Sequence, residues 1–323
     1  MSHNLNPILL VGAGRMAIEY AKVLQKQKVP FICVGRRAST ADTFEKQTGV
    51  SPKTGGLTRF LNEKNWPPSR AIVCVNVEEL CTSTLALLNY GCTNILVEKP
   101  GGLHLEEIEK VACEAQLKKA NVYVAYNRRF YASTKKAKSL IEEDGGVESF
   151  HFEFTELSSR ISTSPLSPKV KENWLLANST HVIDLAFHLG GEPKKMISFS
   201  HGGTTWHPVA SVFTGAGLSE KNALFSYHAN WNTAGRWGIE VMTKKRHLVF
   251  RPLEQLHELK PETFSLKKIP LQDQWDQDYK PGLFSLVEAY LSSPKNKALV
   301  SIEDQYRKTL SWYEQIKYTK GTI

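Results

Sequence analysis

A glycine-rich turn between an apolar run and a helical pattern is the feature that most constrains this chain. The turn follows the apolar residues 7–11 and reads Gly12-Ala13-Gly14-Arg15-Met16-Ala17. Gly12 permits a tight strand-to-helix turn, Gly14 lets the backbone approach a pyrophosphate, and Ala17 lets the helix pack closely on the strand. The first helical turn then offers N–H groups and a positive dipole end to phosphates. Residues 12–16 are therefore predicted to bind a dinucleotide.

Short apolar strands alternate with helical stretches over the first half of the chain. The predicted strands cover 7–12, 30–35, 71–76, 94–97 and 121–125. The predicted helices cover 14–27, 40–47, 78–90 and 104–119. This alternation is typical of a parallel, doubly wound α/β sheet. We expect a dinucleotide-binding domain over residues 1–125, with a connecting segment near 126–131.

The pattern changes in the second half. Phe150, Phe152 and Phe154 alternate with polar residues, as in an antiparallel sheet that is covered on one side. Further strands are predicted at 195–201, 209–214, 222–229, 237–242 and 247–251. Further helices are predicted at 178–189, 283–292 and 303–317. We expect these elements to form a second domain over residues 126–323, with a C-terminal helix that can pack back on the first domain.

Two segments of this second half each allow two interpretations. Lys244-Lys245-Arg246 lies between two predicted strands and is either a basic patch or a solvated hairpin turn, of which we favour the turn. Residues 158–168 are rich in Ser and Pro and are expected to form a mobile loop. That loop is either an active-site lid or a plain surface loop.

Composition is that of an ordinary globular protein. The 323 residues suffice for two domains, and the chain is 41% hydrophobic and 23% charged. No apolar run is long enough for a membrane span, and the run Ile8 to Val11 is too short for a signal-peptide core. All five cysteines lie in the first half without a C-x-x-C pair, which indicates buried, reduced thiols in a cytoplasmic protein.

The net charge of +9 is spread over both predicted domains rather than gathered on one element. A nucleic-acid-binding protein more often concentrates its basic residues, so we expect no nucleic-acid partner. A diffuse positive field suits anionic small molecules, including a phosphorylated cofactor.

The second predicted strand ends in Gly35-Arg36-Arg37. NAD sites usually carry an Asp or Glu at this strand end, which accepts a hydrogen bond from the ribose 2′-hydroxyl. Two guanidinium groups replace that carboxylate here, and Arg pairs with phosphate through charge-assisted hydrogen bonds. Arg36 and Arg37 therefore predict NADP(H) rather than NAD(H). In the alternative interpretation both arginines are solvated, and NAD binds through its hydroxyls alone.

The predicted strand 94–97 leads into Glu98-Lys99-Pro100-Gly101-Gly102. Ligands bind beyond the carboxyl ends of the strands in such sheets. The Lys99 ammonium is therefore placed to hold a substrate hydroxyl or carbonyl and to pass a proton. The alternative is a charged residue in a plain turn.

Four segments together resemble a known family. They are VGAGRMA at 11–17, VEKP at 97–100, YNRRF at 126–130 and NSTHVIDLAFHLGG at 178–191. In this order they are similar to the glucose–fructose oxidoreductase / inositol 2-dehydrogenase (Gfo/Idh/MocA) family. The resemblance implies a Rossmann domain followed by an α+β domain built on a large, mostly antiparallel sheet. It also implies hydride transfer between a nicotinamide cofactor and the hydroxyl or keto carbon of a sugar, cyclitol or nucleotide-sugar.

The same resemblance assigns residues around the cofactor. Lys99 is implied to be catalytic and to contact the reacting hydroxyl, and the Lys99–Pro100 bond is expected to be cis. Glu98 and Pro100 are implied to lie beside the cofactor. Asn127 is implied to contact the cofactor, and Arg128 the substrate.

The histidine motif of the family, Asp-x-x-x-His-x-x-Asp, is only half present. His181 and Asp184 match its second half, and His181 is implied to be catalytic because an imidazole titrates near neutral pH. Ala177 stands where many members carry Asp. Asn178 is a candidate for orienting the substrate but is not a base. Either Lys99 and His181 suffice, or the chemistry differs from that of the sugar-alcohol dehydrogenases.

His181, Asp184 and His188 share one helix face. No partner cluster of ligands is evident, so we predict no metal site. Asp184 is assigned to the substrate site, where it either fixes His181 or only supports the packing, and His188 is expected to pack in a core or an interface. Trp174, just before this helix, is expected to line the substrate pocket.

The segments Tyr227–Trp231 and Arg236-Trp237 combine aromatic rings with polar groups. Such residues suit either stacking on a sugar ring or an oligomer interface. We favour the interface, because members of the family commonly pair their open sheet faces, and we expect a homodimer or a homotetramer.

The sequence is best interpreted as an NAD(P)-dependent oxidoreductase, in which the cofactor carries the hydride and the protein supplies position and charge. Its substrate is expected to be a sugar-like small molecule. The first alternative is a non-catalytic, dinucleotide-binding regulator of the same fold, which Ala177 keeps open and which Lys99 and His181 argue against. The second is cofactor-assisted glycoside cleavage, which the Arg36-Arg37 pair argues against.

Overall fold

The computed structural model describes residues 6–63, 68–292 and 296–318, which form two units. The first unit ends at Tyr126 and also includes the later segment Gln277–Arg307. The second comprises Asn127–Asp276 and the chain from Lys308 onward. The division expected at residues 125 and 126 differs from this one, because a segment of the second half returns to the first unit. Each unit is described by itself.

The first unit is built on a six-stranded sheet with the order β14-β5-β4-β3-β1-β2. Five strands run parallel: β1 (Ile8–Val11), β2 (Phe31–Val34), β3 (Arg70–Val73), β4 (Asn94–Val97) and β5 (Asn121–Val124). The short strand β14 (Val300–Ser301) pairs antiparallel with β5. This confirms the predicted parallel, doubly wound sheet. The strand order reverses between β1 and β3, which is where ligands bind in sheets of this kind.

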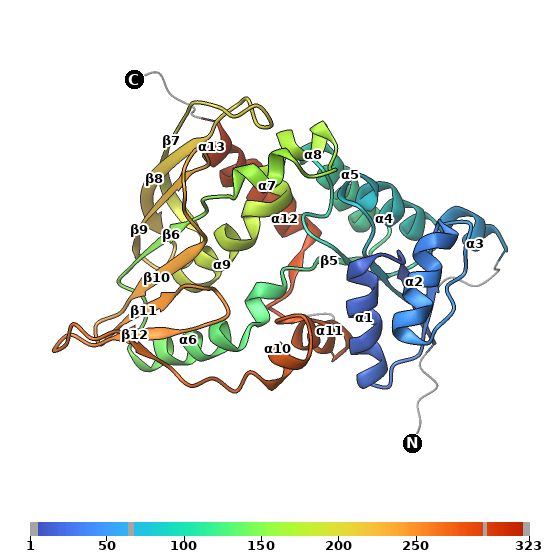
Figure 1. Cartoon of the computed structure of the whole chain (residues 1–323), viewed down its shortest axis with the longest axis horizontal. Helices are drawn as coiled ribbons and strands as arrows, with labels where there is room; N and C mark the ends of the chain where they lie inside the picture. The colour runs from blue at the N-terminus through green and yellow to red at the C-terminus, as the bar shows by residue number, and fades with distance from the viewer. Residues whose placement is uncertain (1–5, 64–67, 293–295, 319–323) are drawn as a thin grey trace. The chain divides into compact units, whose positions relative to one another are not determined.

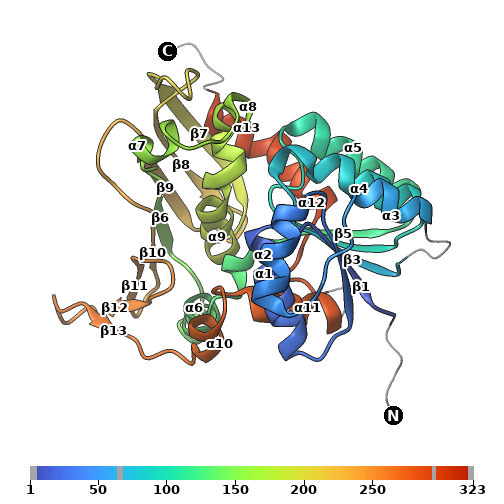
Figure 2. The same ribbon diagram turned by 45° about the vertical axis from the view of Figure 1, so that its right-hand side comes forward.

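Helices cover both faces of this sheet (Figures 1 and 2). They are α1 (Arg15–Lys26), α2 (Ala38–Thr48), α3 (Leu57–Glu63), α4 (Leu80–Asn89), α5 (Leu105–Leu117) and α11 (Leu283–Ser292). α1 packs against α2 and α11, whereas α4 packs against α5. The helix α3 was not predicted from the sequence.

The return of α11 to the first unit has a local cause. Tyr290 is buried in this helix, and its hydroxyl donates hydrogen bonds to the main-chain oxygens of Ala71 (3.0 Å) and Asn94 (2.8 Å). Ala71 lies in β3 and Asn94 begins β4, so one side chain ties the returning helix to two central strands. Burial raises the pKa of Tyr290 well above its ordinary value, so the hydroxyl keeps its proton for these bonds.

The second unit is built on an eight-stranded sheet with the order β13-β12-β11-β10-β6-β9-β8-β7. Its strands are β6 (Ser149–Glu153), β7 (Pro193–His201), β8 (Val212–Ser219), β9 (Leu224–Asn230), β10 (Gly238–Met242), β11 (His247–Phe250), β12 (His257–Leu259) and β13 (Lys267–Lys268). Only the β6–β9 pair is parallel, so the implied large, mostly antiparallel sheet is confirmed.

Residues alternate across this sheet as the sequence indicates. Phe150 and Phe152 of β6 are buried and pack edge-on against Phe187 of the helix α9 (Thr180–Gly190), with ring centroids 5.9 and 5.3 Å apart. A Cβ atom on Gly190 would lie 2.2 Å from the Phe150 ring, so glycine is required where α9 ends against the sheet. The other side of the sheet carries exposed residues, among them Ile197 of β7.

The polar-aromatic segment 227–231 lies within this core rather than at a surface. Tyr227 and Trp231 are buried, and Trp231 stacks on Trp206 with ring centroids 5.3 Å apart. The predicted interface role is therefore wrong for these two rings. Period-two alternation turns Tyr227 to the covered side of β9, whereas its neighbour His228 is exposed.

Several other helices complete the second unit. They are η2 (Asn127–Phe130), α6 (Ala132–Glu143), α7 (Ser158–Ser162), α8 (Pro168–Glu172), η3 (Leu175–Ser179), α10 (Gln274–Asp278), η4 (Thr309–Tyr313) and α13 (Glu314–Lys317). Within the expected loop 158–168, α7 covers Ser158–Ser162 and α8 begins at Pro168. The expected helix 303–317 is interrupted by the π-helical η4, which follows α12 (Ile302–Lys308).

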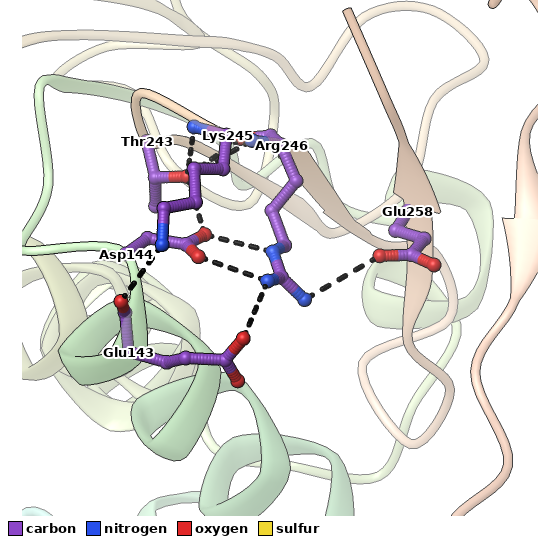
Figure 3. Close-up of polar contacts among 6 residues, drawn as sticks. All are labelled: Glu143, Asp144, Thr243, Lys245, Arg246 and Glu258. Carbon is purple, nitrogen blue, oxygen red and sulfur yellow. Dashed lines mark hydrogen bonds and ion pairs between the residues drawn. The ribbon is translucent and has the colours of Figure 1, made fainter.

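The Lys244-Lys245-Arg246 segment forms the turn between β10 and β11 (Figure 3). Its contacts decide between a basic patch and a solvated turn. Lys244 and Lys245 are exposed, as a solvated turn requires. Arg246 is not part of a basic patch, because its guanidinium pairs with the buried carboxylate of Asp144 at 2.8 Å and with Glu143 at 3.2 Å. Thr243 also donates to Asp144, so the turn is fastened to the end of α6.

Among the described residues, no helix is long and apolar enough to cross a membrane.

Candidate active site

The glycine turn of the first unit has the geometry that its sequence predicts. Gly12 has φ +115°, and a Cβ atom there would lie 2.6 Å from the carbonyl oxygen of Cys74. Only glycine fits this position. A Cβ atom on Gly35 would lie 2.8 Å from that of Ala13, so the end of β2 also packs tightly on the turn.

Gly14 differs from these two glycines. A Cβ atom on Gly14 would meet no protein atom within 4 Å, and its φ is negative. Packing within the unit therefore gives no reason for glycine here, whereas close approach of a ligand does. Gly14 is also the N-cap of α1, and no side chain caps the helix. The turn thus fits a pyrophosphate bound to main-chain N–H groups.

A cavity of about 390 Å³ adjoins this turn. It is lined by Ala13, Gly14, Arg15, Ile18, Glu19, Thr40, Thr43 and Gln47. Its walls therefore come from the start of α1 and from α2, the two helices that flank the expected path of a dinucleotide. Three of the predicted cofactor residues lie in this lining.

Arg36 and Arg37 lie where β2 ends and α2 begins, and both are exposed. The Arg36 guanidinium pairs with the Glu79 carboxylate at 2.6 Å. Glu79 belongs to the short helix η1 (Val77–Glu79), which follows β3. Because Glu79 is far from Arg36 in the sequence, the residues around Arg36 did not predict this ion pair. The strand end of β2 lacks a carboxylate, but the Glu79 carboxylate reaches Arg36 from the segment after β3, which is separated from β2 in the sheet by β1.

The Glu98-Lys99-Pro100 segment follows β4, and the Lys99–Pro100 bond is cis, as expected. The Tyr20 hydroxyl donates to the Glu98 carboxylate at 2.8 Å and holds it against α1. Burial raises the pKa of Glu98, although this hydrogen bond and the Lys99 charge oppose the shift. Lys99 is half-buried beside this carboxylate.

In the second unit, Asn127, Arg128 and Arg129 lie on η2. Asn127 and Arg129 are buried. The Arg128 guanidinium lies 4.9 Å from the centroid of the Trp237 ring, which is a cation–π distance. His181 lies on α9 with its ring 6.3 Å from the same tryptophan. Trp237 therefore links two of the predicted site residues.

Asp184 lies in a buried ion-pair network. Its carboxylate accepts two hydrogen bonds of 2.6 Å from Arg129 and one of 3.1 Å from Lys308, which also pairs with Glu192 at 3.4 Å. Burial alone would raise the pKa of Asp184, but the Arg129 and Lys308 charges hold it well below its ordinary range. This placement favours a structural role over the predicted substrate contact.

His188 is half-buried on α9. Burial and the Arg129 charge lower its pKa to about 2, so this imidazole is neutral. Among the described residues, no group of three or more His, Cys, Asp or Glu side chains is placed to hold a metal ion.

A second cavity, of about 440 Å³, lies in the second unit. It is lined by Thr155, Glu156, Leu157, Arg160, Ile161, Ser164, Trp174, Gly235, Arg236 and Trp237. Trp174 is thus in a pocket, as predicted, and the segment 155–164 forms part of its wall. We refer to this cavity as the Trp174 pocket.

Glu156 is the site residue that the sequence did not reveal. It is buried, and its carboxylate accepts hydrogen bonds from Asn178 (3.1 and 3.2 Å) and from Ser179 (2.7 Å). Asn178 and Ser179 end the π-helical turn η3, a rare conformation that is frequent at functional sites. Ala177 belongs to the same turn. The Glu156 carboxylate, which lies just beyond β6, therefore contacts the segment in which Ala177 replaces the Asp of the family motif.

A family model described as "Oxidoreductase family, NAD-binding Rossmann fold" matches residues 7–126. No curated protein matches the sequence.

Solved structures share the fold of the whole chain. An oxidoreductase from Agrobacterium radiobacter in complex with NAD+, L-tartaric acid and magnesium has a TM-score of 0.76 at 14% identity, with 96% of this chain and 95% of that chain covered. A levoglucosan dehydrogenase in complex with NADH has a TM-score of 0.75 at 18% identity, with 96% and 95% covered. UDP-N-acetylglucosamine 3-dehydrogenase from Acidithiobacillus ferrooxidans has a TM-score of 0.72 at 13% identity, with 96% of both chains covered. At these identities the likeness is one of fold.

Proposed function

Because residues 7–126 belong to the Gfo/Idh/MocA oxidoreductase family, with its NAD-binding Rossmann fold, we propose that the chain transfers a hydride between NADP(H) and a sugar-like substrate. The reacting group is the hydroxyl or keto carbon of a sugar, cyclitol or nucleotide-sugar. The observation that carries the proposal is the glycine turn. Space is open beside Gly14, and α1 begins there without a side-chain cap.

The sugar-like substrate is supported by the Trp174 pocket. An indole ring at its wall suits the apolar face of a sugar, and the Glu156 carboxylate suits its hydroxyl groups. The levoglucosan and UDP-N-acetylglucosamine dehydrogenases of the same fold act on sugars, as their names state. We infer that Glu156 accepts a hydrogen bond from a substrate hydroxyl.

The bound nicotinamide would supply or take up the hydride. The Lys99 ammonium donates a hydrogen bond to the substrate oxygen and thereby polarises a carbonyl or stabilises an alkoxide. The His181 imidazole holds or moves a proton of the substrate, because imidazole suits proton transfer near neutral pH. Trp174 and Trp237 exclude water from the pocket of the second unit. These roles of Lys99 and His181 are proposals carried by the family motifs.

NADP(H) is proposed over NAD(H) because of Arg36 and Arg37. Both guanidiniums lie at the end of β2, and Arg37 has no side-chain partner among the described residues. The structure of the levoglucosan dehydrogenase contains NADH, so the fold alone does not determine whether NAD(H) or NADP(H) binds.

We also infer that two copies of the chain pair through the open face of the eight-stranded sheet. Ile197, Phe199 and Leu224 are exposed there, and Ile197 and Leu224 line a shallow apolar hollow. Clustered apolar residues of this kind are typical of an interface. Light scattering on the purified chain tests this, and a monomer would contradict it.

The decisive test of the function is a titration of the purified protein with NADPH and with NADH, followed by nicotinamide fluorescence. Tight NADPH binding with weak NADH binding supports the proposal, and consumption of NADPH is then measured with ketosugars and nucleotide-ketosugars. Binding of NADPH without turnover of any of these sugars would favour the alternative, a dinucleotide-binding regulator. The observation that favours this alternative is Ala177, which stands where many family members carry Asp. Binding of neither nucleotide would contradict both.

A further inference from the structure

The arginines of the second unit fall into three groups. Arg129, Arg246 and Arg251 each pair with a carboxylate, at 2.6, 2.8 and 2.9 Å respectively. Arg128 lies over the Trp237 ring. The remaining two, Arg160 and Arg236, have no side-chain hydrogen bond or ion pair with any other described residue, and both line the Trp174 pocket.

These two arginines come from separate segments. Arg160 lies on α7, and Arg236 lies in the connection between β9 and β10. Both are exposed, so the N–H donors of each are available to a ligand. Both arginines line the same cavity, so an anion bound there can accept hydrogen bonds from both.

The remaining polar groups of the pocket point to the same chemistry. The Trp174 indole nitrogen is buried and has no hydrogen-bond acceptor among the described residues. Glu156, which is the acidic residue of the lining, already accepts hydrogen bonds from Asn178 and Ser179. The pocket therefore has more donors than acceptors, and its ligand has to bring the acceptors.

We propose that the Trp174 pocket selects a substrate that carries an anionic group, which Arg160 and Arg236 bind. The inference rests on the proposed function, since it takes this pocket as the substrate's. A carboxylate or a phosphate satisfies the chemistry equally, because the guanidinium fork binds both through paired N–H bonds. A cavity of about 440 Å³ accommodates a monosaccharide that carries one such group. The substrate class is thus an acidic sugar or a sugar phosphate rather than a neutral sugar.

The test is calorimetric titration of the full chain with glucose, glucuronate and glucose 6-phosphate, which share a ring and differ in the acidic group. It is run with and without NADPH. We expect at least one anionic sugar to bind about tenfold more tightly than glucose, which is what one charge-assisted hydrogen bond contributes. The comparison of glucuronate with glucose 6-phosphate then separates the carboxylate from the phosphate.

Variants assign the effect to the two arginines. Arg160→Gln and Arg236→Gln are expected to remove the preference for the anionic sugar over glucose. Arg160→Lys keeps the charge and is expected to retain part of the preference. Lys244→Gln is the matched control, because it removes an exposed positive charge from the turn between β10 and β11. The melting temperature of each variant shows that the fold is retained.

Equal affinity for glucose and for both anionic sugars would overturn the inference, and so would a preference that persists in both glutamine variants. Absence of binding by all three sugars would also overturn it. None of these results tests NADPH binding by the first unit or turnover of a neutral sugar. The proposed function is tested separately, by the nucleotide titration and the NADPH consumption assay.

Discussion

The guanidinium of Arg129 and the carboxylate of Asp184 form two parallel hydrogen bonds of 2.6 Å in the interior of the second unit. Arg129 comes from η2 at the beginning of this unit, and Asp184 comes from α9, which packs on the sheet. Lys308, which begins the C-terminal part of the unit, joins the same carboxylate. One acidic side chain thus fastens three parts of the chain that are far apart in sequence.

Replacing Asp184 by Asn is expected to lower the free energy of unfolding by about 3–5 kcal/mol, because the buried Arg129 would lose this charged partner and Lys308 would keep only its pair with Glu192. Asp304→Asn is the control, since its pair with Arg307 is exposed at the surface and a surface pair contributes about 0–1 kcal/mol. Urea unfolding measures both. Equal effects of the two substitutions would contradict a structural role for the Asp184 network.

The same carboxylate predicts how stability depends on pH. The pKa of Asp184 is lower in the folded than in the unfolded chain, so its stabilising effect is complete above the unfolded pKa of about 4. It is lost as the pH falls through the folded pKa. Unfolding measured from pH 6 to pH 3 is expected to show a steep loss of stability at its acidic end. That slope should be shallower in the Asp184→Asn variant.

Gly12→Ala and Gly14→Ala are expected to behave differently. At Gly12 the added methyl group meets the Cys74 carbonyl and the backbone has a positive φ, so the fold should lose more than about 1 kcal/mol. At Gly14 the methyl group meets no protein atom, so the melting temperature should hold while the dissociation constant of NADPH rises. A Gly14→Ala variant that binds NADPH as the parent does would show that no phosphate lies there.

Glu79 is expected to weaken the preference for NADPH, because its carboxylate occupies the Arg36 guanidinium. Glu79→Gln should therefore tighten NADPH binding and leave NADH binding unchanged, whereas Arg36→Glu should weaken NADPH binding by about tenfold or more. Fluorescence titration of both nucleotides measures the ratio. Identical ratios in the parent and the two variants would mean that Arg36 does not contact a 2′-phosphate.

Glu156→Gln is expected to lower kcat/KM by about tenfold or more, because the substrate hydroxyl loses a charge-assisted hydrogen bond. Glu148→Gln is the control, because Glu148 is exposed and its carboxylate pairs only loosely with Lys244, at 3.8 Å. An Asp at position 156 keeps the charge and should restore part of the rate. If Glu156→Gln changes only the melting temperature, the carboxylate serves merely to hold Asn178 and Ser179.

The sequence predicted those features that depend on neighbouring residues. The five parallel strands are short apolar runs, and the turn at Gly12 demands glycine for local reasons, so both could be inferred. The return of α11 depends on one hydroxyl, that of Tyr290, which meets two distant carbonyl oxygens, and no local pattern encodes such contacts.

The same distinction between local and distant contacts applies to the residues of the candidate site. Trp174 was inferred from its place before a motif helix, and it lines a pocket. Glu156 follows a strand without any motif, and its partners lie in a π-helical turn that periodicity alone does not predict. Arg36 was inferred from its place after β2, but its partner Glu79 follows another strand.

The discontinuity of the first unit bears on how the protein is made. While the ribosome synthesises the second unit, the first already has its parallel strands but lacks α11 and β14. The outer edge of β5 stays unpaired until Val300 and Ser301 emerge. An open strand edge is a template for pairing with other chains. The nascent chain is therefore most exposed to misassembly in the interval before residues 300 and 301 leave the ribosome.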